Sequence, residues 1–159
     1  MQKTINNIHK LTVYQYKSGV IFRSPDDSLS IDIKSKNLES DFLGSISNLN
    51  IETIDLVFFS SIPSIVPSKL FDEKLRNKYL ETNTSIKDNI QHELSIDKKI
   101  AVVYSFDKLF VNVLNQMNIK YSSMNYFTVL YNYLCKKDKI SDGLSLYINF
   151  NENSFDILI

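Results

Sequence analysis

The chain has 159 residues, of which 43% are hydrophobic, a length and composition that suit one domain or one lobe of a larger protein. Its 18 basic residues balance its 18 acidic residues, and both kinds are scattered along the chain. Nucleic-acid binders usually carry a basic excess or a basic stripe. We therefore expect no nucleic-acid partner.

The sequence also argues against a secreted or membrane-spanning protein. Residues 1–7 are polar and do not resemble a signal peptide. The longest apolar runs, 56–59 and 100–104, are far shorter than the roughly 20 residues that cross a bilayer. Cys135 is the single cysteine, so no intrachain disulfide can form, as is usual in a reducing cytoplasm. We expect no membrane span and a cytoplasmic location.

The first third of the chain predicts a small sheet with one covering helix. Three short β-rich segments, 11–16, 20–22 and 29–33, are separated by turn sequences and predict an antiparallel meander. Apolar residues then recur at helical spacing over 38–49, which predicts an amphipathic helix that covers one face of the meander. The continuously apolar segment 53–61 predicts a central strand that is buried on both faces.

The middle of the chain predicts a helix, a loop and a pair of strands. Pro63 and Pro67 interrupt regular structure, and Ser68 occupies the N-cap position of a predicted second helix. The polar residues 81–88 are typical of a loop. After this loop the sequence predicts strands at 90–96 and 100–106 with a tight turn between them.

The last third predicts two more helices and a closing hairpin. Asp107 is the expected cap of a third helix, which ends at Asn118, and Asn125 is the expected cap of a fourth. A short strand lies between these two helices. Apolar and polar residues alternate over 144–150, and a second β-rich run at 155–159 completes the hairpin pattern.

Strands that alternate with helices after an initial meander indicate an α/β domain with a mixed sheet and flanking helices. This order resembles a ribonuclease-H-like lobe, the unit of which the actin-like ATPase superfamily uses two. The resemblance implies a first lobe at 1–142, with a possible inserted subdomain at about 86–124, and the opening hairpin of a truncated second lobe at 143–159.

A narrower resemblance rests on the segments 57–61, 66–71 and 79–80 and on the closing hairpin. They are similar to a bacterial family of unknown function, number 3822 in the domain-of-unknown-function series. Its members resemble actin-like proteins related to the pilus-assembly and cell-division actin homologues. Members are typically longer, so the resemblance implies that most of a second lobe is missing from this chain.

The resemblance also places a phosphate-binding loop in the closing hairpin. In the heat-shock chaperone and sugar-kinase branches of the superfamily, an Asp at the end of the first strand is followed by glycines and then by Thr. Glycine is needed because backbone amides must approach the phosphate oxygens closely. The corresponding positions in this chain carry other side chains: Asn149 for the Asp, Asn151, Glu152 and Asn153 for the glycines, and Ser154 for the Thr.

These substitutions argue against nucleotide chemistry. Glu152 would place a carboxylate beside the phosphates, and Asn149 lacks the charge that holds Mg²⁺ through water. The same resemblance implies that the first hairpin, at 14–19, would be the counterpart of the other phosphate loop, and it offers one glycine and no acidic residue. We therefore expect degenerate phosphate loops, no catalytic residues and no cofactor.

Other candidate residues have a simpler structural interpretation. His9 and His92 lie far apart without Cys or paired acidic residues at ligand spacing, so we expect no metal site. Cys135 lies near the apolar stripe of the fourth predicted helix and is expected to pack rather than react.

Two segments are candidates for binding another protein. Ile65 and Val66 lie between two prolines in a predicted rigid loop, which is either a docking surface or a structural connection. Phe155 and Ile157 give the closing hairpin an apolar face, and its outer strand has an unpaired edge.

The sequence therefore favours an actin-like lobe without enzymatic activity that assembles or binds a protein partner. One alternative is a nucleotide-binding actin-like ATPase whose site is completed by a missing lobe or by another subunit. A second alternative is an inactive fragment.

Overall fold

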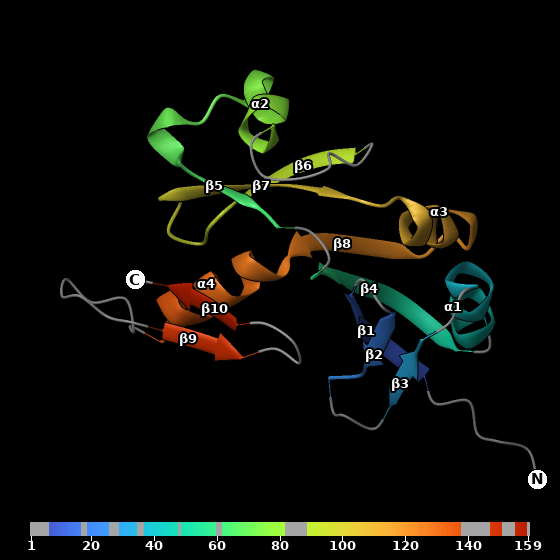
Figure 1. Ribbon diagram of the computed structural model, residues 1–159. Coiled ribbons are helices and arrows are strands. Elements are labelled where there is room, and N and C mark those ends of the chain that lie inside the picture. The colour runs from blue at the N-terminus through green and yellow to red at the C-terminus, as the bar shows by residue number, and fades with distance from the viewer. Residues whose placement is uncertain are drawn as a thin grey trace, which may run out of the picture.

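The computed structural model describes residues 7–16, 19–25, 29–34, 37–47, 49–59, 62–81, 89–137, 147–150 and 155–158. Its largest sheet is five-stranded and mixed, in the order β3-β2-β1-β4-β8 (Figure 1). The antiparallel pairs β1–β2 and β2–β3 confirm the predicted meander, and β4 is central because it pairs in parallel with both β1 and β8. These strands are β1 (Asn7–Gln15), β2 (Val20–Arg23), β3 (Ser30–Ile33), β4 (Asn50–Phe58) and β8 (Lys120–Asn125).

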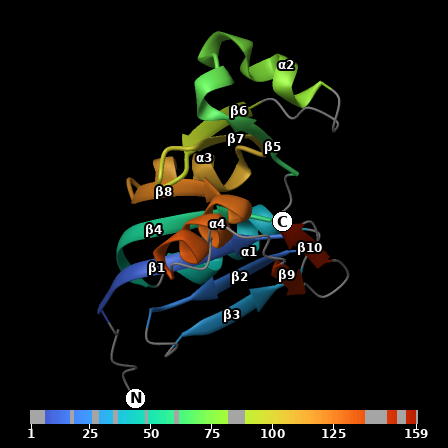
Figure 2. The same ribbon diagram turned by 90° about the vertical axis from the view of Figure 1, so that its left-hand side faces the viewer.

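Three further strands form a second, antiparallel sheet in the order β5-β7-β6. They are β5 (Ser64–Pro67), β6 (Asn89–Leu94) and β7 (Ile100–Phe106). In both views this sheet lies on the β8 side of the five-stranded sheet, and β3 lies farthest from it (Figures 1 and 2). Along the chain, the segment from β5 to β7 lies between β4 and the helix that leads to β8.

Three helices confirm the sequence prediction: α1 (Leu38–Ile46), α3 (Leu109–Gln116) and α4 (Tyr126–Lys136). Local hydrogen bonds explain where two of them begin. Asp107 Oδ1 accepts a 3.0 Å bond from the Leu109 amide, and Asn125 Oδ1 accepts a 2.9 Å bond from the Phe127 amide. Asn118 follows α3 with a positive φ of 56°, a backbone conformation that Asn tolerates.

The helix predicted to follow Ser68 is confirmed only at its end. The structure has two short 3₁₀ turns, η1 (Ser68–Leu70) and η2 (Glu73–Leu75), followed by a short helix, α2 (Arg76–Leu80). Ser68 does not cap a helix because it is bound to the turn between β6 and β7. Its hydroxyl donates to the Lys98 carbonyl at 2.7 Å and its amide to the Lys99 carbonyl at 2.9 Å.

The main core lies between the five-stranded sheet, the helices α1 and α3, and one face of the second sheet. Phe42 stacks on Phe22 with ring centroids 5.3 Å apart and meets Phe110 edge-on at 4.8 Å. The opposite face of β7 packs with Val66 and Leu80, so β7 is buried on both sides, as its apolar sequence predicts. Residues of β4, α1, α3 and β7 that are buried in the main core include Ile54, Leu56, Phe58, Phe42, Ile46, Phe110, Val111, Val113, Leu114, Val102, Tyr104 and Phe106.

The predicted closing hairpin is confirmed as a separate antiparallel sheet of two strands, β9 (Tyr147–Phe150) and β10 (Phe155–Leu158). Neither strand pairs with any other strand in the described part of the chain. An isolated two-stranded sheet is only marginally stable in water.

Candidate functional site

Parallel pairing brings the carboxyl ends of β1, β4 and β8 to one edge of the sheet. In α/β proteins with parallel strands, ligands usually bind outside such an edge. Aromatic residues follow all three strands here. The Phe59 ring stacks on the Tyr16 ring and on the Tyr126 ring, with centroid distances of 4.6 Å in each case. Tyr14 meets Phe59 edge-on at 6.0 Å.

We call Tyr16, Phe59 and Tyr126 the aromatic row. Tyr16 follows β1, Phe59 follows β4, and Tyr126 is the first residue of α4. A 2.8 Å bond from the Phe59 amide to the Gln15 carbonyl ties the first two of these segments together. The three side chains are partly buried. The row thus presents stacked apolar rings at the edge where a phosphate site would need amide groups and carboxylates.

The single glycine of the first hairpin has a structural role. A Cβ at Gly19 would lie 2.2 Å from the Ile33 carbonyl oxygen, so β3 passes too close for any side chain. Among the described glycines none has a positive φ. Gly19 is therefore explained by the pairing of β2 with β3 and needs no phosphate ligand to explain it.

The closing hairpin holds most of the positions named for phosphate binding. Asn149 lies in β9 and is paired in register with Asp156 of β10. The positions 151–154, which comprise Asn151, Glu152, Asn153 and Ser154, lie outside the described residues.

The candidate docking residues lie on two strands. Phe155 and Ile157 are in β10, in register with Phe150 and Ile148, and the Ile148 side chain is 48% exposed. Ile65 and Val66 lie in β5.

The segment between Pro63 and Pro67 is therefore an edge strand and not the predicted loop. Proline is tolerated there because an edge strand leaves one row of amide positions unpaired. Ile65 is 48% exposed, but Val66 is only 9% exposed because it packs against Leu80 and Val103.

A polar seam, which sequence reasoning missed, joins the second sheet to β8 and α4. Ser123 donates its hydroxyl to Gln91 Oε1 at 3.2 Å, and the Asn125 amide donates to Glu93 Oε1 at 2.8 Å. Gln91 and Glu93 alternate along β6 and are in register with Tyr104 and Val102, which face the main core. Polar residues at inward strand positions are the sequence signal that marks this seam.

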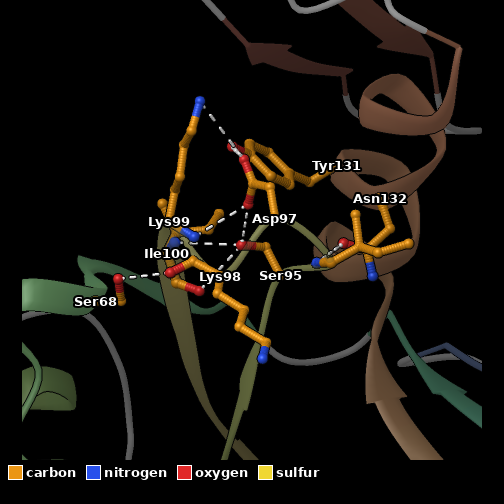
Figure 3. Close-up of polar contacts among 9 residues, drawn as sticks. Ser68, Ser95, Asp97, Lys98, Lys99, Ile100, Tyr131 and Asn132 are labelled. Atoms are coloured by element: carbon orange, nitrogen blue, oxygen red, sulfur yellow. Dashed lines mark hydrogen bonds and ion pairs between the residues drawn. The ribbon is translucent and has the colours of Figure 1, made fainter.

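The seam continues at the turn between β6 and β7, shown in Figure 3. Asp97 accepts hydrogen bonds from the Ser95 hydroxyl at 2.6 Å, the Lys99 amide at 3.1 Å and the Tyr131 hydroxyl at 3.2 Å. Asn132 Oδ1 accepts a 2.8 Å bond from the Ile96 amide. Tyr131 and Asn132, which both belong to α4, thus bind the turn to the helix.

These contacts and the burial of the turn shift the pKa values of Asp97, Tyr131 and Cys135. Burial disfavours the Asp97 charge, but the hydrogen bonds from Ser95, the Lys99 amide and Tyr131 outweigh it and lower the Asp97 pKa. Burial and the Asp97 charge raise the pKa of the Tyr131 hydroxyl. Burial, followed by the Asp97 charge, also raises the pKa of the Cys135 thiol. A thiol with a raised pKa is a poor nucleophile, which agrees with a packing role for Cys135.

Neither a metal site nor a membrane span is found in the described residues. They contain no group of three His, Cys, Asp or Glu side chains that could hold a metal ion. His92 instead lies beside the Phe71 ring, with centroids 4.8 Å apart. In the same ranges no helix has the length and apolar character needed to cross a membrane.

The fold is that of an α/β lobe of the actin-like ATPase class. The structure is similar to a Bacteroides thetaiotaomicron protein of actin-like ATPase fold and unknown function, with a TM-score of 0.73 and 14% identity over 99% of this chain and 67% of that chain. The chain belongs to the family described as "Protein of unknown function (DUF3822)", whose model matches residues 39–159. The fold and the family expected from the sequence are confirmed.

A weaker similarity links the chain to the cytoplasmic domain of EpsL, an inner-membrane component of the type II secretion system of Vibrio cholerae. The TM-score is 0.41, with 13% identity over 73% of this chain and 56% of that chain. No curated protein matches the sequence.

Proposed function

We propose that this protein is an actin-like lobe without enzymatic activity that assembles with itself or binds a protein partner. The aromatic row is the observation that carries the proposal. Three stacked rings lie at the carboxyl ends of β1, β4 and β8, where a member of this fold class would bind phosphates. Stacked rings favour contact with another protein over coordination of Mg²⁺.

The two hairpins support the same proposal. Gly19 is accounted for by the close approach of Ile33, and Asn149 offers no carboxylate for a Mg²⁺-bound water. In this proposal residues 1–142 are the first lobe and residues 143–159 open a second one. The hairpin of β9 and β10 then gains stability when another strand or another protein covers it.

Nucleotide binding is tested by thermal unfolding with and without millimolar Mg-ATP. We expect no change in Tm, because the site lacks the groups that bind the triphosphate. A ligand present at a hundredfold excess over Kd would add about 2.7 kcal/mol to the free energy of unfolding, which shifts Tm by several degrees. Mg²⁺ alone and Mg-ADP serve as controls.

An upward shift with Mg-ATP that Mg²⁺ alone does not produce would overturn the proposal. It would favour the alternative, a nucleotide-binding actin-like ATPase completed by a further lobe or another subunit. The inactive-fragment alternative predicts no self-association and no partner, which the next experiment tests.

A charge on the apolar side of β10 is expected to weaken assembly. Phe155 and Ile157 alternate with Asp156 along this strand. We expect Ile157→Lys and Phe155→Lys to weaken self-association or partner binding by about tenfold or more, because burying an unpaired ammonium costs more than the roughly 1.4 kcal/mol that a tenfold change represents.

Asp156→Lys is the matched control for that experiment, since it introduces the same side chain on the other side of the strand. Multi-angle light scattering of the parent chain and the three variants over a concentration series gives the association constants. If both apolar-side variants associate as the parent does, the β10 edge is not an interface.

A further inference from the structure

The seam between β6 and α4 contains the Glu93 carboxyl, which forms no ion pair with any residue that the structure describes. Glu93 Oε1 accepts a 2.8 Å bond from the amide of Asn125, the residue that caps α4. We propose that Glu93 is a proton-operated latch that holds the second sheet against the start of α4.

Among the described residues, the groups around Glu93 come from three elements, and none of these groups carries a positive charge. Tyr104 of β7 is fully buried and is the titratable group that faces the carboxyl. The start of α4 contributes the Asn125 amide and the Thr128 hydroxyl, with Asn125 fully buried and Thr128 3% exposed. From β8, Ser123 is uncharged and is bonded to Gln91.

Two charged groups at the turn between β6 and β7 pair with each other. Lys99 Nζ lies 4.0 Å from Asp97 Oδ2 at the turn between β6 and β7. Glu93 is therefore a partly buried acid in a polar but uncharged joint, held by the hydrogen bond from the Asn125 amide. Burial and the charge of the Glu93 carboxylate raise the pKa of the Tyr104 hydroxyl, which favours the neutral form of Tyr104.

The protonated carboxyl fits this joint better than the carboxylate. Protonation leaves Oε1 free to accept from Asn125 and adds one O–H donor among buried hydroxyl groups. Deprotonation places an unpaired charge between the sheet and the helix. In agreement, burial raises the Glu93 pKa, and the nearby Thr128 hydroxyl and the hydrogen bond from the Asn125 amide offset this rise only in part.

The direction of the pH effect follows from that raised pKa. The folded state keeps the Glu93 proton at pH values where the unfolded chain has already lost it. The contribution to stability is thus fully present below the unfolded pKa and is lost as the pH rises through the folded pKa. The latch is tight in acid and loosens toward neutral pH.

Amide hydrogen exchange between pH 4 and pH 8, corrected for the intrinsic exchange rates, tests the latch. We expect the protection of the Asn125 amide and of β6 to fall about tenfold per pH unit between the unfolded and folded pKa values, as the loss of one proton requires. Glu93→Gln, which keeps the acceptor oxygen, should abolish this slope. Glu39→Gln, at an exposed position of α1, should leave it unchanged.

An equal slope in the parent chain and in Glu93→Gln would overturn the proposal. A second readout does not depend on the folding of that variant. In the parent chain the ¹³C resonance of the Glu93 carboxyl should titrate above the value of an unfolded glutamate. Titration at or below that value would equally contradict the latch.

Discussion

Replacing Phe58 with alanine is expected to lower the free energy of unfolding by about 3–5 kcal/mol, the range measured when buried aromatic residues are truncated. Phe58 is the last residue of β4, and its side chain is completely buried. Its ring stacks on Phe106 with centroids 4.8 Å apart and lies 6.1 Å from the Tyr104 ring. The substitution therefore removes a contact between the two sheets and leaves a cavity where they meet.

Urea unfolding of the purified variant, followed by circular dichroism, measures this loss. Ile62→Ala is the control, because Ile62 follows the same strand but is 59% exposed, and exposed substitutions change stability by only about 0.5 kcal/mol. Since whole domains are stable by about 5–15 kcal/mol, Phe58→Ala can remove cooperative unfolding altogether. A loss below about 1 kcal/mol would mean that the two sheets do not depend on this contact.

The elements that local sequence patterns determine were predictable. Asp107 and Asn125 each accept a hydrogen bond from the backbone amide two residues ahead. Their capping roles therefore depend only on residues that are close in the sequence. The central place of β4 was visible in its continuous apolar run, because a strand covered on both faces needs no polar alternation.

The elements that depend on distant residues were not predictable in the same way. The sequence of the segment Ser64–Pro67 is typical of a loop bounded by prolines. It forms a strand because it pairs with β7, which is distant in the sequence. Ser68 has the side chain of a helix cap, but the carbonyls of Lys98 and Lys99 compete for it. The residues near Ser68 in the sequence do not indicate that it will contact the turn between β6 and β7.

The candidate site also contains one part that local sequence patterns predict and one part that they do not. The hairpin and its alternating residues follow from local pattern, so β9 and β10 were expected. The aromatic row was not, because Tyr16, Phe59 and Tyr126 meet only after three strands have aligned in parallel. In the sequence Tyr126 is only the residue that follows Asn125, the expected cap of the fourth helix.

Gly19→Ala and Gly44→Ala are expected to change stability in opposite directions. A Cβ at Gly19 would lie 2.2 Å from the Ile33 carbonyl oxygen, and this contact is with backbone that cannot rotate away. To relieve it, β3 would have to move from β2, where Val20 is paired with Ile33. We expect a loss of about 1–3 kcal/mol or more, as overpacking in a core produces.

Gly44 is the matched control, because it lies within α1 and a Cβ there would have no atom within 4 Å. Alanine at a helix interior is more stable than glycine by about 1 kcal/mol, so Gly44→Ala should raise the urea midpoint while Gly19→Ala lowers it.

The pair also distinguishes two roles for Gly19. If Gly19→Ala keeps the stability of the parent, the pairing of β2 with β3 does not require the glycine, and a ligand at the first hairpin becomes the better explanation for it. If stability falls and Mg-ATP still gives no shift, Gly19 serves the sheet, as the Ile33 contact predicts.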